Sequence, residues 1–395
     1  MTTHVPTPTP ARRPAAAGFT LIELTVSLGL LGGFVLFLVQ LLSTSISVFE
    51  EGETGQETAD RVASASTAVE GAFADLLGDP TATERRPPTA RLLVQWVPLG
   101  FAAAPETPHV QIVRASVRLS EGEEERLLRR KLLPEAQRTA RTSSDADVAE
   151  RLERLVATTP RIRRGEMLLV PWPAGDFLEL RRGLFLPDQR IPIDEQRDVA
   201  LFEPETLGGV EFPPEAILAA TEPFASGLLH FEIRFRSQYT KDFESLAANE
   251  GPEFVWDSAR AGLLSSEDAP TNRRFTLDLG PASLDDASDD VFPRAVQIRI
   301  TVARDMAETI LVGDLGARDV DARIANGDAL PDVPFLKIGA EWVRRREVRT
   351  TQLTGLERGL RGSKPSPHPA GTPVRAGRPT LIVVPLLHGR DAWNG

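Results

Sequence analysis

The feature that most constrains this chain is an uninterrupted apolar stretch close to its N-terminus. Residues 24–49 contain no Asp, Glu, Lys, Arg or His. About 20 apolar residues are enough for a helix to cross a bilayer, so this stretch predicts one membrane-spanning helix. Arg12 and Arg13 precede it, whereas Glu50 and Glu51 follow it. Because positive charge is retained on the cytoplasmic side, we expect the N-terminus in the cytoplasm and the bulk of the chain outside.

One ionisable residue, Glu23, lies at the entrance to the apolar stretch. A carboxylate in a membrane-entering helix is costly, so it is expected to have a function and a partner. Glu23 ends the segment GFTLIE of residues 18–23, which follows a Pro-rich, cationic leader of residues 1–18. Together they resemble the class III signal of type IV prepilins and pseudopilins. The alternative is an ordinary single-pass anchor with a chance Glu near its start.

The resemblance implies specific roles for three residues. A prepilin peptidase would cut between Gly18 and Phe19, and the new amine of Phe19 would be methylated. Glu23 would pair in the membrane with the amine of a neighbouring subunit, because a lone buried charge costs far more than a paired one. The implied partners are the prepilin peptidase, other minor and major pilins or pseudopilins, the inner-membrane assembly platform and membrane lipid. The implied location is the bacterial inner membrane, crossed once with a periplasmic head, and later a cell-envelope filament.

The predicted helix continues beyond the membrane. Apolar residues recur there at the spacing of one helix face: Val62, Ala65, Val69, Ala72, Phe73 and Leu76. Residues 78–80 (GDP) are typical of a helix end. We therefore expect a cleaved leader over residues 1–18, a helix over residues 19–79 and a head over residues 80–395. The membrane segment of that helix is residues 24–49, and its second half should pack on the head.

The head is predicted to be mostly antiparallel β structure. Residues 229–236 and 296–302 alternate strictly between apolar and polar side chains, which predicts strands with one wet face. Further candidate strands are residues 92–97, 110–113, 167–170, 177–180 and 381–384. Residues 121–164 form a charged insertion that predicts two amphipathic helices, either simply solvated or docking a partner. The expected fold class is α+β: a pilin-like lollipop whose long N-terminal helix packs on this β-rich head.

A second resemblance lies in the head. Residues 229–235, Trp256 with Asp257, and residues 292–300 are similar in order to J-type (PilW-like) minor pseudopilins. This implies a structural subunit that helps to initiate or cap assembly of the pseudopilus of a type II secretion system. The nearest alternative is a minor pilin of a type IV pilus, acting in adhesion, motility or DNA uptake. A rival of another class is a membrane-anchored enzyme or binding protein with a pilin-type leader.

The sequence offers little sign of catalysis, and we expect no catalytic residue. The five histidines are scattered, without the H-E-x-x-H spacing of a zinc site, and His230 is expected on a solvated strand face. No Gly-x-Ser-x-Gly elbow is present. The chain has no cysteine, which excludes disulfides and thiol catalysis.

Two acidic groups are candidate calcium sites. One is Asp285, Asp286, Asp289 and Asp290; the looser second is Asp314, Asp319, Asp321 and Asp328. Clustered carboxylates can bind Ca²⁺, but neither group has the ligand spacing of a calcium loop, so solvated turns are the favoured interpretation. No cofactor is otherwise expected.

The charge distribution bears on possible partners. The formal net charge is −11, so nonspecific binding of nucleic acid is not expected. Residues 341–378 are nevertheless rich in arginine. They predict either a solvated, arginine-rich strand and loop or a patch that faces DNA or an acidic neighbouring subunit.

Overall fold

The computed structural model describes most of the chain. The described residues are 21–76, 91–101, 109–139, 145–187, 189–192, 198–201, 214–236, 244–245, 254–258, 262–265, 293 and 295–386. The chain divides into two compact units, Met1–Gln56 and Glu57–Gly395. The division falls within the first helix.

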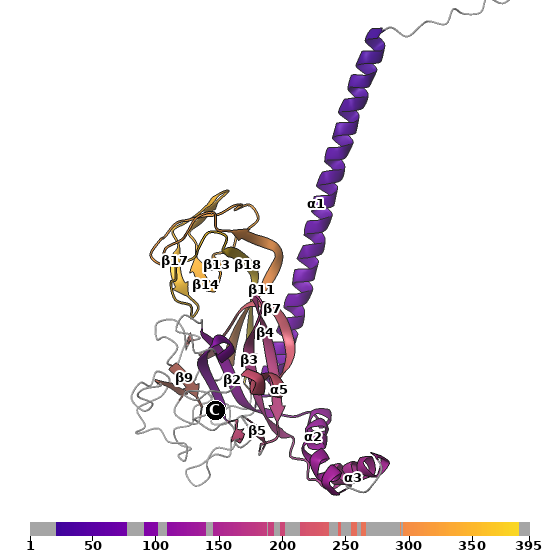
Figure 1. Ribbon diagram of the computed structural model, residues 1–395, viewed down its shortest axis with the longest axis vertical. Coiled ribbons are helices and arrows are strands. Elements are labelled where there is room, and N and C mark those ends of the chain that lie inside the picture. Colours follow the sequence, from indigo (N-terminus) through magenta and orange to yellow (C-terminus); the bar gives the residue numbers. More distant parts are fainter. Residues whose placement is uncertain are drawn as a thin grey trace, which may run out of the picture. The chain divides into compact units, whose positions relative to one another are not determined.

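Helix α1 (Leu21–Ala74) contains 54 residues (Figure 1). No proline interrupts it. In the first unit its segment Thr25–Ser43 is long and apolar enough to cross a membrane, and none of that segment is buried in the protein. Contiguous Leu, Val and Phe side chains on every face of a helix are stable only in an apolar environment. Among the described residues there is therefore one candidate membrane span.

In the second unit α1 packs on the sheet through the predicted stripe. All six stripe residues are buried, and Val69 and Phe73 are almost completely enclosed. The predicted end of the helix was wrong by a few residues, because α1 stops at Ala74. Leu76 instead forms an antiparallel bridge with Val117, and the Arg118 amide donates to the Asp75 carbonyl. Sheet pairing thus ends the helix before the glycine and proline that were expected to do so.

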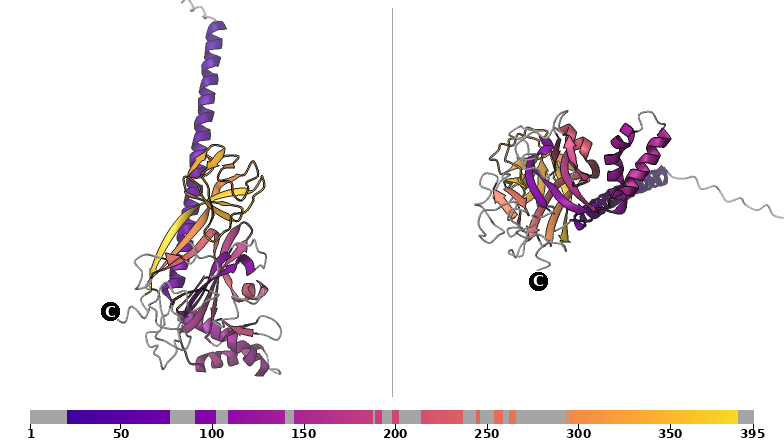
Figure 2. Two further views of the ribbon diagram at one scale, coloured as in Figure 1. Left: turned by 90° about the vertical axis from the view of Figure 1, so that its left-hand side faces the viewer. Right: turned by 90° about the horizontal axis from the view of Figure 1, so that it is seen from below.

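Among the described residues, thirteen strands form one antiparallel sheet (Figures 1 and 2). Its order is β10-β9-β1-β2-β3-β4-β7-β11-β18-β13-β14-β17, with β8 paired to β7. The bounds are β1 (Leu92–Pro98), β2 (His109–Arg118), β3 (Arg164–Ala174), β4 (Phe177–Phe185), β7 (Glu222–Arg236), β8 (Glu244–Ser245), β9 (Phe254–Asp257), β10 (Gly262–Ser265), β11 (Ala295–Ile310), β13 (Phe335–Ile338), β14 (Glu341–Arg344), β17 (Glu357–Leu360) and β18 (Pro373–Pro385). Every predicted strand is present, and most are longer than predicted.

Smaller elements surround this sheet. Strands β12 (Ala322–Arg323), β16 (Gln352–Thr354) and β15 (Glu347–Arg349) form a second sheet, and β5 (Arg190–Pro192) pairs with β6 (Asp198–Ala200). Leu99–Phe101 is a short 3₁₀ helix, and α5 (Pro214–Ala220) precedes β7. The predicted insertion is confirmed as α2 (Glu121–Thr139) and α3 (Asp145–Thr158), which connect β2 to β3 and lie side by side (Figures 1 and 2).

Helix α2 begins with a reciprocal cap. The Glu123 amide donates to Ser120 Oγ, and the Ser120 amide donates to Glu123 Oε2. Arg129 on α2 then reaches Glu125 on its own helix and Glu153 on α3. These pairs are exposed, so packing of the two apolar faces carries more of the association than charge does.

The long strands β11 and β18 pass through two separate cores. Val296, Ile298 and Ile300 belong to the core beneath α1, whereas Ala307 belongs to a second core formed with β13 and β14. The β11–β18 register shifts between Ala303 and Glu308, where the first core gives way to the second. The C-terminal strands β13, β14 and β17 gather at this end of β11 and β18 (Figure 1).

The expectation of one wet face on residues 229–236 was wrong. Residues 228–233 of β7 are buried on both faces, including His230 and Glu232. Trp342 of β14 packs on the face that was expected to be solvated, and its ring meets that of His230 edge-on at 5.4 Å between centroids. Strict alternation in the sequence was therefore compatible with polar side chains that are buried by a segment distant in the sequence.

Candidate functional site

The residues singled out at the N-terminus are only partly described. Gly18 and Phe19 lie outside the described residues, and Glu23 lies in α1 but its side chain is outside them. The acidic group Asp285, Asp286, Asp289 and Asp290 also lies outside. Their roles remain predictions from the sequence.

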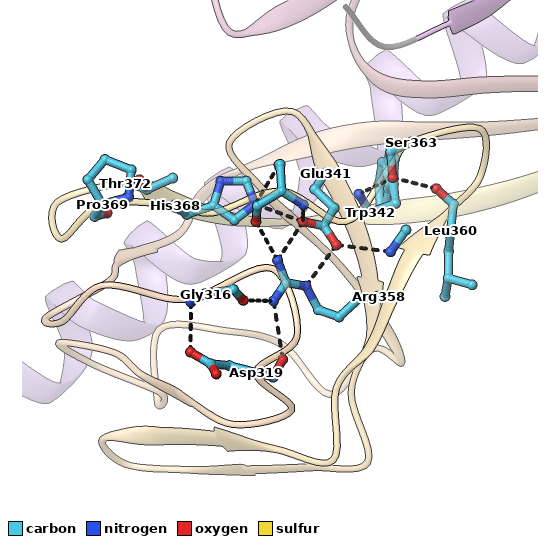
Figure 3. Close-up of polar contacts among 12 residues, drawn as sticks. Gly316, Asp319, Glu341, Trp342, Arg358, Leu360, Ser363, His368, Pro369 and Thr372 are labelled. Atoms are coloured by element: carbon cyan, nitrogen blue, oxygen red, sulfur yellow. Dashed lines mark hydrogen bonds and ion pairs between the residues drawn. The ribbon is translucent and has the colours of Figure 1, made fainter. Parts of the chain in front are cut away.

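The most completely built polar site surrounds Glu341 at the start of β14 (Figure 3). Arg358 of β17 approaches it with two nitrogens, Nε at 2.7 Å from Oε1 and Nη2 at 2.7 Å from Oε2. The backbone amides of Gly359 and Ser366 donate to the same carboxylate, and His368 Nε2 lies 2.8 Å from Oε2. The Glu341 side chain is only 1% exposed, so nearly every lone pair is used inside the protein.

These contacts set the charge of Glu341. Burial alone would raise its pKa, but the hydrogen bonds from Arg358, His368 and the two amides outweigh burial and lower the pKa to about 2. The same guanidinium donates to the carbonyls of Gly316 and Ser366. The pair thus ties β14 and β17 to the segment that follows β17 and to the distant loop that contains Gly316.

The Glu341 cluster includes a serine, a histidine and a carboxylate, but they are not arranged as a catalytic triad. A triad needs the serine at one ring nitrogen and the acid at the other. Here Ser366 Oγ lies 3.4 Å and Glu341 Oε2 lies 2.8 Å from the same atom, His368 Nε2. The geometry suits a buried structural ion pair.

The interpretation of residues 341–378 as a solvated arginine-rich region was wrong for several of its arginines. Arg358 and Arg345 are almost fully buried, and Arg345 donates to the Val333 carbonyl and to Asp332. Arg375 bridges Glu308 and Asp176. Arg344, Arg346 and Arg349 are exposed. Several of these arginines therefore form ion pairs or hydrogen bonds within the protein, because the fold brings acidic side chains from other segments next to them.

The second acidic group is also used within the protein. Asp314, Asp319 and Asp321 accept hydrogen bonds from the backbone amides of Ala370, Gly316 and Gly355, respectively. Within the described part of the chain, no group of three or more His, Asp or Glu side chains is arranged to hold a metal ion. At these three positions the carboxylates act as caps of turns.

A cavity of about 350 Å³ lies beside this site, between β7, β13 and β14 and the turn that joins β3 to β4. Four basic side chains line it: His109, His230, Lys337 and Arg361. Its apolar wall includes Leu99, Val110, Phe177, Phe231 and Trp342. Gly175, Asp176 and Ala340 are exposed at the rim, so the cavity is reached from solvent there.

The surroundings of His230 differ from those expected of a residue on a solvated strand face. Burial, together with the positive charges of Arg361 and Lys337, lowers its pKa to about 4 against the opposing effect of Glu232. The ring is therefore neutral at pH 7. Its Nε2 atom is buried without a hydrogen-bond partner among the described residues, 3.7 Å from Glu232 Oε2. His230 is a buried wall residue, whereas the sequence predicted a surface one.

Arg361 is held in a strained position. Its φ is 53°, and the guanidinium lies over the rings of Phe335 and Trp342 at 4.3 and 4.4 Å from their centroids. A non-glycine residue in this region of φ costs about 1–3 kcal/mol and persists only where its surroundings enforce it. The following Gly362 has φ 79°, and a Cβ there would lie 2.7 Å from the ring of Trp96.

Sequence reasoning thus missed both the Glu341 pair and the cavity. The one available signal was the coincidence of Gly355, Gly359 and Gly362 with arginines between them, since each glycine has a positive φ. Comparison with models of protein families, with curated protein sequences and with solved structures finds no match for this chain.

Proposed function

We propose that this chain is a minor subunit of a type IV filament system, and specifically a J-type minor pseudopilin of type II secretion. Helix α1 is the observation that carries the proposal. One helix contains an uncharged segment able to span a bilayer and, further along, an apolar stripe that packs on an antiparallel sheet. The helix begins at Leu21, within the segment GFTLIE of residues 18–23.

The proposed mechanism begins at the membrane. A prepilin peptidase removes residues 1–18, and the amine of Phe19 is methylated. Glu23 then needs a cation to offset the cost of a carboxylate in lipid, and the amine of a neighbouring subunit can supply it. The pairing would place one subunit in register with the next at the assembly platform.

The second unit supports a structural role in this proposal. Its best-built polar cluster, around Glu341, ties strands and loops together and has no triad geometry. A folded head joined to a membrane-crossing helix is compatible with assembly into a filament. In this role the subunit would initiate or cap a pseudopilus together with other minor subunits.

Processing is the direct test. The chain is produced in a host with and without a prepilin peptidase, and the N-terminus of the product is determined by mass spectrometry. We expect a chain that begins at methylated Phe19 only when the peptidase is present. Gly18→Ala should be cut more slowly, because the scissile backbone needs close approach at this position. A chain that still begins at Met1 in the presence of the peptidase would overturn the assignment.

A further inference from the structure

The cavity beside Trp342 has more positive charge than its surroundings neutralise. Among the described residues, no carboxylate lies within ion-pair distance of the Lys337 ammonium or the Arg361 guanidinium. The described hydrogen bond of the Arg361 side chain is to the hydroxyl of Thr301, at 3.2 Å. Burial lowers the pKa of Lys337 to about 8 and that of Arg361 to about 10.

The acids nearest to these cations are already engaged. Asp176 Oδ2 accepts a hydrogen bond from Arg375 at 2.8 Å, and Glu232 Oε1 accepts one from Arg234 at 3.0 Å. Arg375 lies on β18 and Arg234 on β7. A buried cation without a counterion costs free energy. The chain has a net charge of −11, yet none of its described carboxylates pairs with Lys337 or Arg361.

The acidic side chain among the residues that line the cavity is Asp176, which already accepts from Arg375, and two nitrogens of the wall have no hydrogen-bond partner in the described part of the chain. The indole N–H of Trp96 is buried without a hydrogen-bond partner among the described residues. His230, 5% exposed, adds a ring nitrogen in the same condition. The ammonium, the guanidinium and the indole can only donate. A matching ligand must therefore bring acceptor atoms and negative charge.

The size of the cavity and its apolar walls further restrict the kind of ligand that can bind. Small-molecule sites commonly occupy about 300–1,000 Å³, so this cavity lies at the lower end of that range. It is too small for a folded domain or a nucleic-acid helix. Phe177, Phe231 and Leu99 offer contact to an apolar group, and the planar guanidinium of Arg361 matches a carboxylate.

We propose that this cavity binds a carboxylate attached to an apolar, preferably aromatic, group of about the size of one amino-acid residue. Lys337 and Arg361 hold the carboxylate, and the aromatic wall holds the apolar group. The ligand can be a free acid or the C-terminal residue of a polypeptide, which present the same chemistry. The inference is independent of the proposed assembly role, because it does not involve residues 18–23.

The test measures binding to the full chain in an uncharged detergent by titration calorimetry. The probes are N-acetyl-phenylalanine, its uncharged amide, a short peptide that ends in phenylalanine with a free or amidated C-terminus, and inorganic phosphate. We expect the free acid to bind at least about tenfold more tightly than its amide, in keeping with one charge-assisted contact. Binding of the free-ended peptide would identify chain ends as a source, whereas binding of N-acetyl-phenylalanine alone would restrict the ligand to free acids.

Substitutions of the lining residues test whether any binding takes place in the cavity. Lys337→Met keeps the length and apolar stem of the side chain but removes its charge, and should weaken binding of the acid by about tenfold or more. Lys364→Met is the matched control, because Lys364 is exposed and does not line the cavity. Arg361→Lys retains a positive charge but lacks the planar guanidinium, and it should weaken binding of the acid. The melting temperature of each variant is measured to check that it is folded. Equal binding of acid and amide, equally tight binding of phosphate, or wild-type binding by folded Lys337→Met would overturn the proposal.

Discussion

At the scale of single residues, Glu341 shows how a buried charge depends on its partners. Two strands, β14 and β17, provide two Arg–Glu pairs with opposite environments. The Glu341–Arg358 side chains are 1% and 6% exposed, whereas Arg344 and Glu357 are both more than half exposed. The same chemistry should therefore have very different consequences for stability.

Arg358→Met should destabilise the protein by about 3–5 kcal/mol, because it leaves the buried carboxylate of Glu341 without its cation. Arg344→Met, in the same pair of strands, should cost no more than about 1 kcal/mol, because water screens an exposed pair. Denaturant unfolding of the two variants measures the difference. Equal losses would mean that the Glu341 pair is not the tie between β14 and β17.

The pH dependence of that loss is the control. The pKa of Glu341 is lowered from 4.5 to about 2 in the fold, so its pairing stabilises fully above about pH 4.5 and is lost as the pH falls towards 2. Arg358→Met removes the cation that holds this pKa down. The gap in free energy of unfolding between wild type and variant should therefore shrink on acidification below about pH 4.5. A gap independent of pH would assign the loss to packing.

At the scale of elements, α1 serves two environments with one regular helix. Its segment Thr25–Ser43 is apolar on every side, whereas only one face of the segment after Glu57 is apolar and buried. The second pattern needs a sheet to cover it, and the core beneath α1 includes residues from β1, β2, β7 and β11. The stripe is thus part of the core and not a spare binding face.

Phe73→Ala should destabilise the second unit by about 3–5 kcal/mol, because Phe73 is 1% exposed and its removal leaves a cavity against the sheet. Glu70→Ala, on the exposed side of the same turn, should change stability by less than about 0.5 kcal/mol. Melting curves of both variants in the same detergent provide the comparison. Equal melting temperatures would show that the stripe does not stabilise the unit.

At the scale of the whole molecule, the proposed role in assembly depends on the charge of Glu23. Glu23→Gln keeps the size and polarity of the side chain but removes the charge that attracts a neighbouring amine. Processing and insertion should survive, because the apolar segment is unchanged, but crosslinking to partner subunits should fall sharply. Glu23→Asp should be intermediate, because the charge remains with a shorter reach. The measurement is crosslinking yield in a strain without the native copy, and wild-type yield from Glu23→Gln would contradict the mechanism.

The sequence by itself determined the features that depend on neighbouring residues. The uncharged run, the helical spacing of Val62 to Leu76 and the alternation of residues 296–302 each predicted an element that the structure contains. Such signals are local because a helix or strand repeats every few residues, and one buried face is enough to impose the repeat.

Only the tertiary structure decided which polar residues are buried and what they meet. His230 alternates like a surface residue, yet Trp342 of β14 covers it. Glu341 finds Arg358 only through the register of β14 and β17, and Arg361 reaches the cavity only through a left-handed turn. These contacts join segments that are separated in the sequence. The periodicity of a strand or helix indicates which face is apolar, but it does not indicate whether another segment covers the polar face.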